Sequence, residues 1–342
     1  MANKKKLTRK EMRRRRRQRI LIIKTVALCA LLVVLGVAVW FLAGSPRIGS
    51  GGKGESASNS EDQKEDETQD ASDDTPTKEE LIAQADALAM TYDYDGAISL
   101  LQNTEGAATD PDMIAKISEY TEAKNACVKV DITQVTHVFY HSLVVDPQKA
   151  FFQDNDQTEG FCEWMTTVDE FNRITQQMYD NGYVLVALHD LVNQTVDENG
   201  TVHFTPGEIY LPEGKKPYVL SLDDLSYYHS YDGRGIASKM VLDENGKPTC
   251  EYIQDDGTVV TGAYDCVPLL DQFLEEHPDA AYHGAKGTIA LTGYDGILGY
   301  RTDSAYKTRE NLSDDQVKWL EEHPDFDWEK ECEEAKKVAE AI

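Results

Sequence analysis

The sequence of 342 residues lacks the features that mark several protein classes. It has six cysteines but no Cys-x-x-Cys pair, and the five outside its apolar N-terminal stretch cannot all pair with one another. It is therefore neither a disulfide scaffold nor a structural zinc module. Its 34 Lys and Arg residues face 61 Asp and Glu residues, for a net charge of -27. This shortage of cations argues against nucleic-acid binding, because neutralising phosphates requires a basic face.

The few cations are distributed unevenly, and an apolar stretch separates the basic end from the acidic remainder. Residues 1–19 are rich in Lys and Arg, with Glu11 as their only acid. Residues 20–43 are apolar apart from Lys24 and a threonine, and about 20 apolar residues suffice for a helix to cross a bilayer. By the positive-inside rule the basic tail stays in the cytoplasm. We therefore expect a single-pass protein of the cell membrane with an extracellular C-terminal domain.

A cleaved signal peptide is the competing interpretation of this stretch. Its apolar region would be shorter, about 7–15 residues, and a small-residue cleavage site would follow. Here the apolar run is longer, and Gly44-Ser45-Pro46 is a poor cleavage site. We favour an uncleaved anchor.

The exported part is predicted to contain a linker, a helical unit and an α/β domain. Residues 44–77 are acidic and polar and should be disordered, because they cannot bury enough apolar surface to offset chain entropy. Residues 78–130 show helical periodicity and resemble a single tetratricopeptide-type hairpin, too little for a stable array. This unit could be a stalk packed on its neighbour, a peptide-binding surface or the working part of a surface scaffold.

From residue 131 to 342, predicted strands and helices alternate. Thr167 and Glu170 form a capping box that predicts a helix ending near Asn181-Gly182. Continuous apolar runs predict buried strands, and Asn-Gly or Asp-Gly pairs predict hairpin turns. The predicted strands cover 135–140, 183–188 and 218–222, and further helices cover 267–276, 314–322 and 328–342. This alternation favours a parallel α/β barrel or a doubly wound sheet.

Two adjacent acids, Asp223 and Asp224, follow the buried strand 218–222. In α/β barrels the C-terminal strand ends form the catalytic face. Two neighbouring carboxylates repel unless a cation compensates their charge, so a metal could hold one while the other accepts a proton. Successive side chains on a strand point in opposite directions, so both acids can reach one pocket only if the chain turns there. A solvated loop or a helix cap is the plain alternative.

The surrounding residues resemble the polysaccharide deacetylase family, also called the NodB-homology or carbohydrate esterase family 4 group. The similarity begins at Tyr140-His141-Ser142, like the opening "YH" strand of that family, and passes through the helix that ends at Asn181-Gly182-Tyr183. It reaches Ser221-Leu222-Asp223-Asp224, which matches the motif "TFDD" with two substitutions. It covers the chain from about Thr136 onward and implies a deacetylase-like (β/α) barrel.

That resemblance implies a function and a set of site residues. Asp223 would be the general base and Asp224 the ligand of a divalent metal, with zinc the first expectation. The reaction would be hydrolysis of the N-acetyl amide of an amino sugar, and the partner a cell-envelope polysaccharide such as peptidoglycan. His141 would line the pocket. Arg301 could be structural or could face the substrate.

The family completes its metal site with a His-Ser/Thr-x-x-His motif, and no such motif follows Asp224. His137 and His141 lie on one face of a predicted strand, about 13 Å apart, too far to share a metal. His277 and His323 each lie in the hexapeptide LEEHPD, where helix capping is the simpler role. We therefore expect a partial domain whose chain stops before the remaining ligands are reached, with the missing motif encoded beyond Ile342.

Two functional hypotheses follow. The first is a membrane-anchored polysaccharide deacetylase, an amide hydrolase. The second is a non-catalytic surface protein that binds glycan or protein, in which Asp223 and Asp224 are vestigial. The sequence does not specify an oligomeric state.

Overall fold

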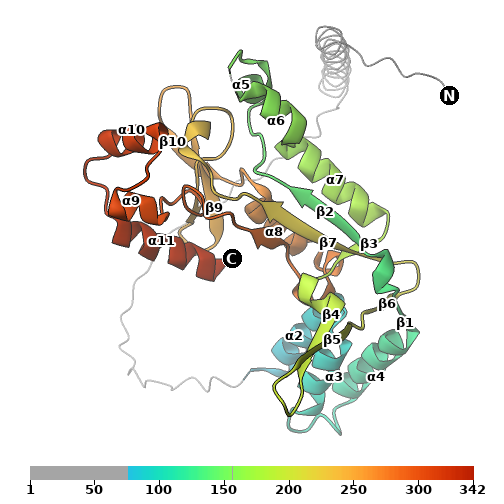
Figure 1. Ribbon diagram of the computed structural model, residues 1–342. Coiled ribbons are helices and arrows are strands. Elements are labelled where there is room, and N and C mark those ends of the chain that lie inside the picture. The colour runs from blue at the N-terminus through green and yellow to red at the C-terminus, as the bar shows by residue number, and fades with distance from the viewer. Residues whose placement is uncertain (1–75, 156) are drawn as a thin grey trace, which may run out of the picture. The chain divides into compact units, whose positions relative to one another are not determined.

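The computed structural model of the protein describes residues 76–155 and 157–342 (Figure 1). Among these residues, no helix is both long and apolar enough to cross a membrane. The predicted basic tail (1–19), the predicted span (20–43) and nearly all of the predicted linker (44–77) lie outside the described residues.

The described part opens with three helices, α2 (Lys78–Met90), α3 (Tyr94–Gln102) and α4 (Pro111–Ala126). Each begins at a side chain that accepts hydrogen bonds from backbone N–H groups of the first turn, namely Thr77, Asp93 and Asp110. Helix α3 packs between α2 and α4 around a small apolar core. The helices predicted within 78–130 are present.

A four-stranded parallel sheet follows, made of β2 (Thr136–Tyr140), β3 (Tyr183–Leu185), β7 (Lys216–Asp223) and β11 (Thr288–Ala290). Strand β7 pairs with all three others: β3 lies along its start, β2 along its middle and β11 along its end. Because these pairings are parallel, the carboxyl ends of β2, β7 and β11 lie at the same edge of the sheet. The strands predicted over 135–140 and 218–222 are confirmed.

Helices α7 (Val168–Asp180) and α8 (Cys266–Glu276) pack against this sheet (Figure 1). Phe171 of α7 and Leu270 of α8 share an apolar core with Leu220 and Leu222 of β7. Side chains alternate along a strand, so the intervening residues of β7 face the other way. Phe139 of β2, which also lies on that second face, is 52% exposed.

The capping box predicted at Thr167 and Glu170 is confirmed at the start of α7, where both reciprocal hydrogen bonds are present. Strand β3 is shorter than the run predicted over 183–188. The Val186 N–H still donates to the Tyr218 carbonyl at 2.9 Å, but the Asp190 carboxylate then accepts from the Ala187 N–H and the chain enters a 3₁₀ turn.

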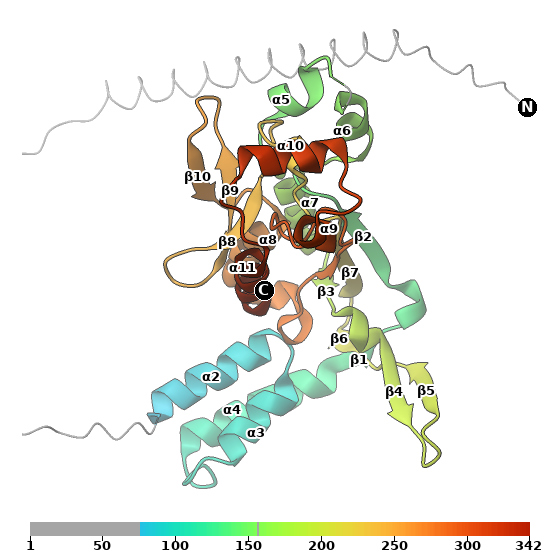
Figure 2. The ribbon, with the colours of Figure 1, turned by 60° about the vertical axis from the view of Figure 1, so that its left-hand side comes forward.

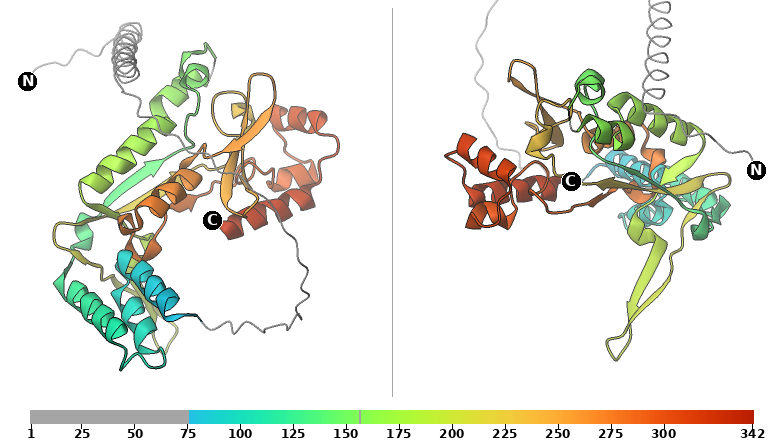
Figure 3. Two further views of the ribbon diagram at one scale, coloured as in Figure 1. Left: turned by 180° about the vertical axis from the view of Figure 1, so that it is seen from behind. Right: turned by 45° about the horizontal axis from the view of Figure 1, so that its top comes forward.

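Antiparallel hairpins are inserted along the chain between the strands of the sheet, and they turn at the Asn-Gly and Asp-Gly pairs predicted as turns. They comprise β4 (Val192–Val196) with β5 (Val202–Pro206), and β8 (Lys239–Leu242), β9 (Pro248–Ile253) and β10 (Val259–Gly262). Figures 2 and 3 show the β4–β5 hairpin projecting from the other described elements. A further pair joins β1 (Cys127–Lys129) to β6 (Tyr210–Pro212).

Five more helices complete the described part: α5 (Pro147–Phe152), α6 (Thr158–Trp164), α9 (Ser304–Thr308), α10 (Asp314–Glu322) and α11 (Trp328–Ala341). His277 is the C-cap of α8 and His323 that of α10, as predicted from the repeated hexapeptide. The fold is therefore mixed α/β, as expected. Within the described ranges, however, the parallel strands form an open sheet and do not close into a barrel.

Candidate functional site

The site is built at the end of the central strand, where the chain changes direction. Asp223 still belongs to β7 and pairs with Ala290 of β11. Asp224 adopts a left-handed backbone conformation, with φ of 57°, and its N–H donates to the Ala290 carbonyl at 3.2 Å. The turn that the sequence required for the acid pair is thus present at Asp224.

The turn sends the two carboxylates to different surroundings. Asp223 accepts a hydrogen bond from the Ser221 hydroxyl at 3.4 Å, on its own face of the strand. Ser221 also contacts His137, with 2.9 Å between Oγ and Nε2. Asp224 instead lines a cavity of about 530 Å³, and Asp223 is not among the lining residues. The structure therefore does not place both acids in one pocket.

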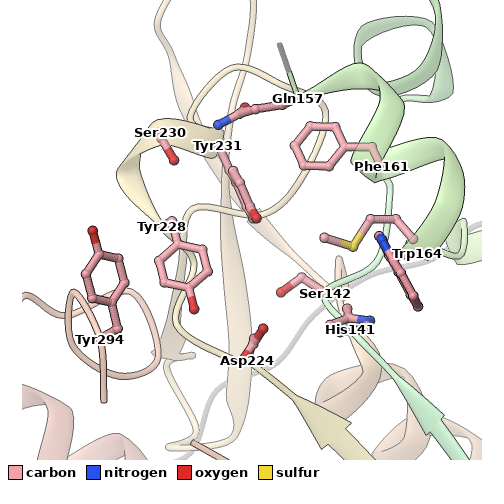
Figure 4. A pocket seen from close by; sticks show the side chains of 12 residues that line it. His141, Ser142, Gln157, Phe161, Trp164, Asp224, Tyr228, Ser230, Tyr231 and Tyr294 are labelled. Carbon is pink, nitrogen blue, oxygen red and sulfur yellow. The ribbon is translucent and has the colours of Figure 1, made fainter. Parts of the chain in front are cut away.

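Several elements meet around this cavity (Figure 4). The end of β2 contributes His141 and Ser142, so the predicted pocket-lining histidine lies in the same cavity as Asp224. Aromatic side chains form much of the remaining wall: Phe161 and Trp164 from α6, Tyr228 and Tyr231 from the segment after β7, and Tyr294 from the segment after β11.

A fully buried carboxyl group, Asp265, holds the β2 end of the cavity in place. It begins α8, and its Oδ1 accepts from the Cys266 N–H at 2.7 Å and from the Leu143 N–H at 3.2 Å. Burial raises the pKa of Asp265 to about 6, which its hydrogen bonds only partly counter. This side chain ties the residues after His141 to α8. Sequence reasoning missed it, although an Asp directly before an apolar helix is an N-cap signal.

Arg301 lies in a buried polar network. The residue is 3% exposed, its Nη2 donates to the Tyr227 carbonyl at 2.9 Å, and its Nη1 lies 3.3 Å from Asp295 Oδ2. This placement favours the structural role over contact with substrate, because Arg301 does not line the cavity that holds Asp224.

Asp295 is the centre of that network. Besides Arg301, its carboxylate contacts His229 Nδ1 at 3.2 Å and accepts from the Tyr306 hydroxyl and the Gln316 amide. Burial alone would raise the pKa of Asp295, but the His229 hydrogen bond and the Arg301 charge outweigh it and lower the pKa to about 2. The network therefore holds a buried carboxylate in its charged form.

The described side chains do not by themselves fit a metal ion. Among them, no group of three or more His, Cys, Asp or Glu residues is placed to hold one. The rings of His137 and His141 each contact Phe139, at centroid distances of 6.3 and 6.1 Å, so an aromatic ring lies between the two histidines. Asp224, the residue predicted to bind the metal, does line the cavity.

The segment after β7 carries much of this site and is held in place by the main core. Leu225 and Tyr227 are buried in the main core, and the Leu225 carbonyl accepts from the Leu298 N–H at 2.8 Å. The strand end, the Tyr294 segment and the buried network are thus linked by backbone hydrogen bonds. Comparison of the chain with protein-family models, with curated proteins and with solved structures finds no match.

Proposed function

We propose that this protein is a membrane-anchored, metal-dependent hydrolase that removes N-acetyl groups from a cell-envelope polysaccharide. One observation carries the proposal. His141 and Asp224 come from the carboxyl ends of two neighbouring parallel strands, and they line the same cavity. Those are the positions where the resemblance expects a pocket residue and a metal ligand, and strand ends of this kind carry the chemistry in α/β folds.

Asp223 is proposed as the general base and Asp224 as a ligand of a divalent metal, with zinc the first candidate. The bound metal would polarise the water that attacks the amide. Asp224 alone is too few ligands for a metal ion, so we propose that further ligands complete the site and that the open parallel sheet is part of a (β/α) barrel. Asp223 is partly exposed and bonded to Ser221, so it would need to turn toward the cavity to accept a proton.

The N-terminal region supports the proposed location. A basic tail, an apolar stretch and an acidic linker precede the helices in that order. They would anchor the domain and hold it on the outer side of the membrane. A polymer of the cell envelope is then within reach of the cavity.

The test is acetate release by the product of the complete reading frame, including any codons after Ile342. Oligomers of N-acetylglucosamine and purified peptidoglycan serve as substrates, with zinc or cobalt added or removed. We expect metal-dependent release that falls by at least about 100-fold in Asp223→Asn and in Asp224→Asn. Asp325→Asn, in an exposed segment far along the chain, is the matched control.

Undiminished release from Asp224→Asn, or from the wild type after removal of metal, would contradict the proposal. So would a complete reading frame without a His-Ser/Thr-x-x-His motif.

A non-catalytic glycan-binding protein is the second candidate. The observation that favours it is the position of Asp223, which lies outside the cavity lining. That candidate predicts saturable binding of the same oligomers with no acetate release under any metal condition.

A further inference from the structure

We propose that Trp164 and Tyr294 are two stacking platforms for sugar rings on either side of Asp224, so that the cavity binds internal units of a polymer. This inference rests on the proposed function and adds the chain length of the substrate. It assigns specificity to two residues that belong to no motif of the sequence.

The first observation is the exposure of these two aromatic rings. Trp164 is 65% exposed and Tyr294 is 59% exposed, although both line the cavity. Figure 4 shows them on opposite sides of the cavity, with Asp224 between them. Within the described part of the chain, the Trp164 indole N–H has no hydrogen-bond partner. Exposed aromatic surface beside convergent polar groups is typical of a ligand site.

The remaining aromatic residues of the cavity are explained by packing. Tyr231 makes edge-to-face contacts with Tyr228 and Phe161, at centroid distances of 5.3 and 5.0 Å. Tyr228 in turn lies 5.8 Å from Tyr294, so the wall continues to the exposed ring. The wall holds Tyr294 at one side while leaving most of its surface uncovered. Trp164, the last residue of α6, has no such aromatic neighbour among the described residues.

Polar groups of the cavity complement these rings. A pyranose ring has an apolar face of C–H groups and a rim of hydroxyl and acetamido groups. The C–H face can cover an aromatic ring, while the rim needs hydrogen-bond partners. Ser142 and Ser230 offer hydroxyl groups, and Gln157 Oε1 is a buried acceptor without a partner among the described residues. An N–H or O–H donor of the ligand would satisfy it.

The arrangement sets the expected length of the ligand. If the sugar that reacts lies over Asp224, the units before and after it lie toward Trp164 and Tyr294. With a different sugar unit on each platform, binding energy should grow from one unit to about three units and then level off. A polymer would be modified at internal positions.

The experiment is isothermal titration of the full chain in detergent micelles with β-1,4-linked N-acetylglucosamine oligomers of one to six units. We expect affinity to rise with length up to about three units. Trp164→Ala and Tyr294→Ala should each weaken binding of the longer oligomers roughly tenfold and leave the single sugar nearly unchanged. Trp164→Phe should recover part of the loss. Phe204→Ala is the control, because Phe204 is 64% exposed on β5 and does not line the cavity.

Equal affinity for one and six units, unchanged affinity in both alanine variants, or no binding by the wild type would each overturn the inference. Acetate release separates this failure from failure of the proposed function. If Trp164→Ala and Tyr294→Ala leave oligomer binding unchanged while acetate release depends on Asp224, the inference fails and the proposed function stands. If oligomer binding depends on length and on both rings while Asp224→Asn leaves acetate release unchanged, the proposed function fails and the inference stands.

Discussion

Replacing Arg301 by methionine tests what holds the segment after β7 in place. Methionine keeps much of the length and apolar character of the arginine stem but removes its charge and all its donors. The substitution deletes the 3.3 Å ion pair with Asp295 and the 2.9 Å hydrogen bond to the Tyr227 carbonyl. Both partners are buried, so neither can turn to water without local unfolding.

The expected cost follows from these contacts. Removing one partner of a buried ion pair destabilises a protein by about 3–5 kcal/mol, because the other charge is left uncompensated. Asp295 keeps hydrogen bonds from His229, Tyr306 and Gln316, which favours the lower end of that range. We therefore expect Arg301→Met to lower the free energy of unfolding by about 3 kcal/mol.

Urea denaturation followed by circular dichroism measures this cost, and a double-mutant cycle isolates the pair. Asp295→Asn should be destabilising by a similar amount, since it leaves Arg301 buried without its counter-charge. The double variant should then be less unstable than the sum of the single changes, by about 2 kcal/mol. Additive effects, or a loss below about 1 kcal/mol for Arg301→Met, would refute the reasoning.

Two further predictions concern stability. Thr167→Ala removes the capping box of α7 and should cost about 1 kcal/mol by thermal or urea unfolding, while Thr308→Ala should cost less than half as much. The folded-state pKa of Asp295, about 2, lies below its ordinary value of 3.8, so its stabilising contribution is present above that value and is lost as the pH falls toward 2. Wild-type protein should therefore lose about 1 kcal/mol more stability than Asp295→Asn between pH 6 and pH 3; parallel pH profiles would contradict this.

Local signals explain which parts of the fold could be predicted from the sequence. The capping box at Thr167, the Asn-Gly turns and the apolar run before Asp223 act over a few residues, and each produces the expected element. Helix α5 was not predicted, although it begins at Asp146-Pro147 just as α4 begins at Asp110-Pro111, and Pro directly after a capping Asp is a helix-start signal. The helix is short, and its apolar residues show no clear period.

Non-local contacts explain what could not be predicted. Asp295 and Arg301 are six residues apart in a glycine-containing segment, and only the tertiary fold makes them a buried pair. Asp265 similarly serves a backbone N–H more than a hundred residues earlier, at Leu143. The same limit applies to the cavity. A family resemblance predicted Asp224 and His141 as residues of one site. The aromatic residues of the cavity wall come from separate segments, and no sequence pattern predicted that these segments would meet.

The barrel expectation illustrates the same point for topology. Alternating strands and helices identify parallel pairing, and β2, β3, β7 and β11 pair in that way. The number of strands and the closure of a sheet depend on pairings across the whole chain. Within the described residues the sheet stays open, and its connections carry antiparallel hairpins or short helices, either beside a longer helix such as α7 or α8 or without one.

The left-handed turn at Asp224 has a consequence for how this protein could change over time. A side chain in that backbone region costs on the order of 1 kcal/mol relative to glycine, which occupies it freely. The cavity thus bears its carboxylate against the conformational preference of the main chain. If the carboxylate were no longer needed for function, substitution of Asp224 by glycine would relieve this backbone cost and stabilise the fold. Sequences that have lost the activity should therefore often carry glycine at this turn.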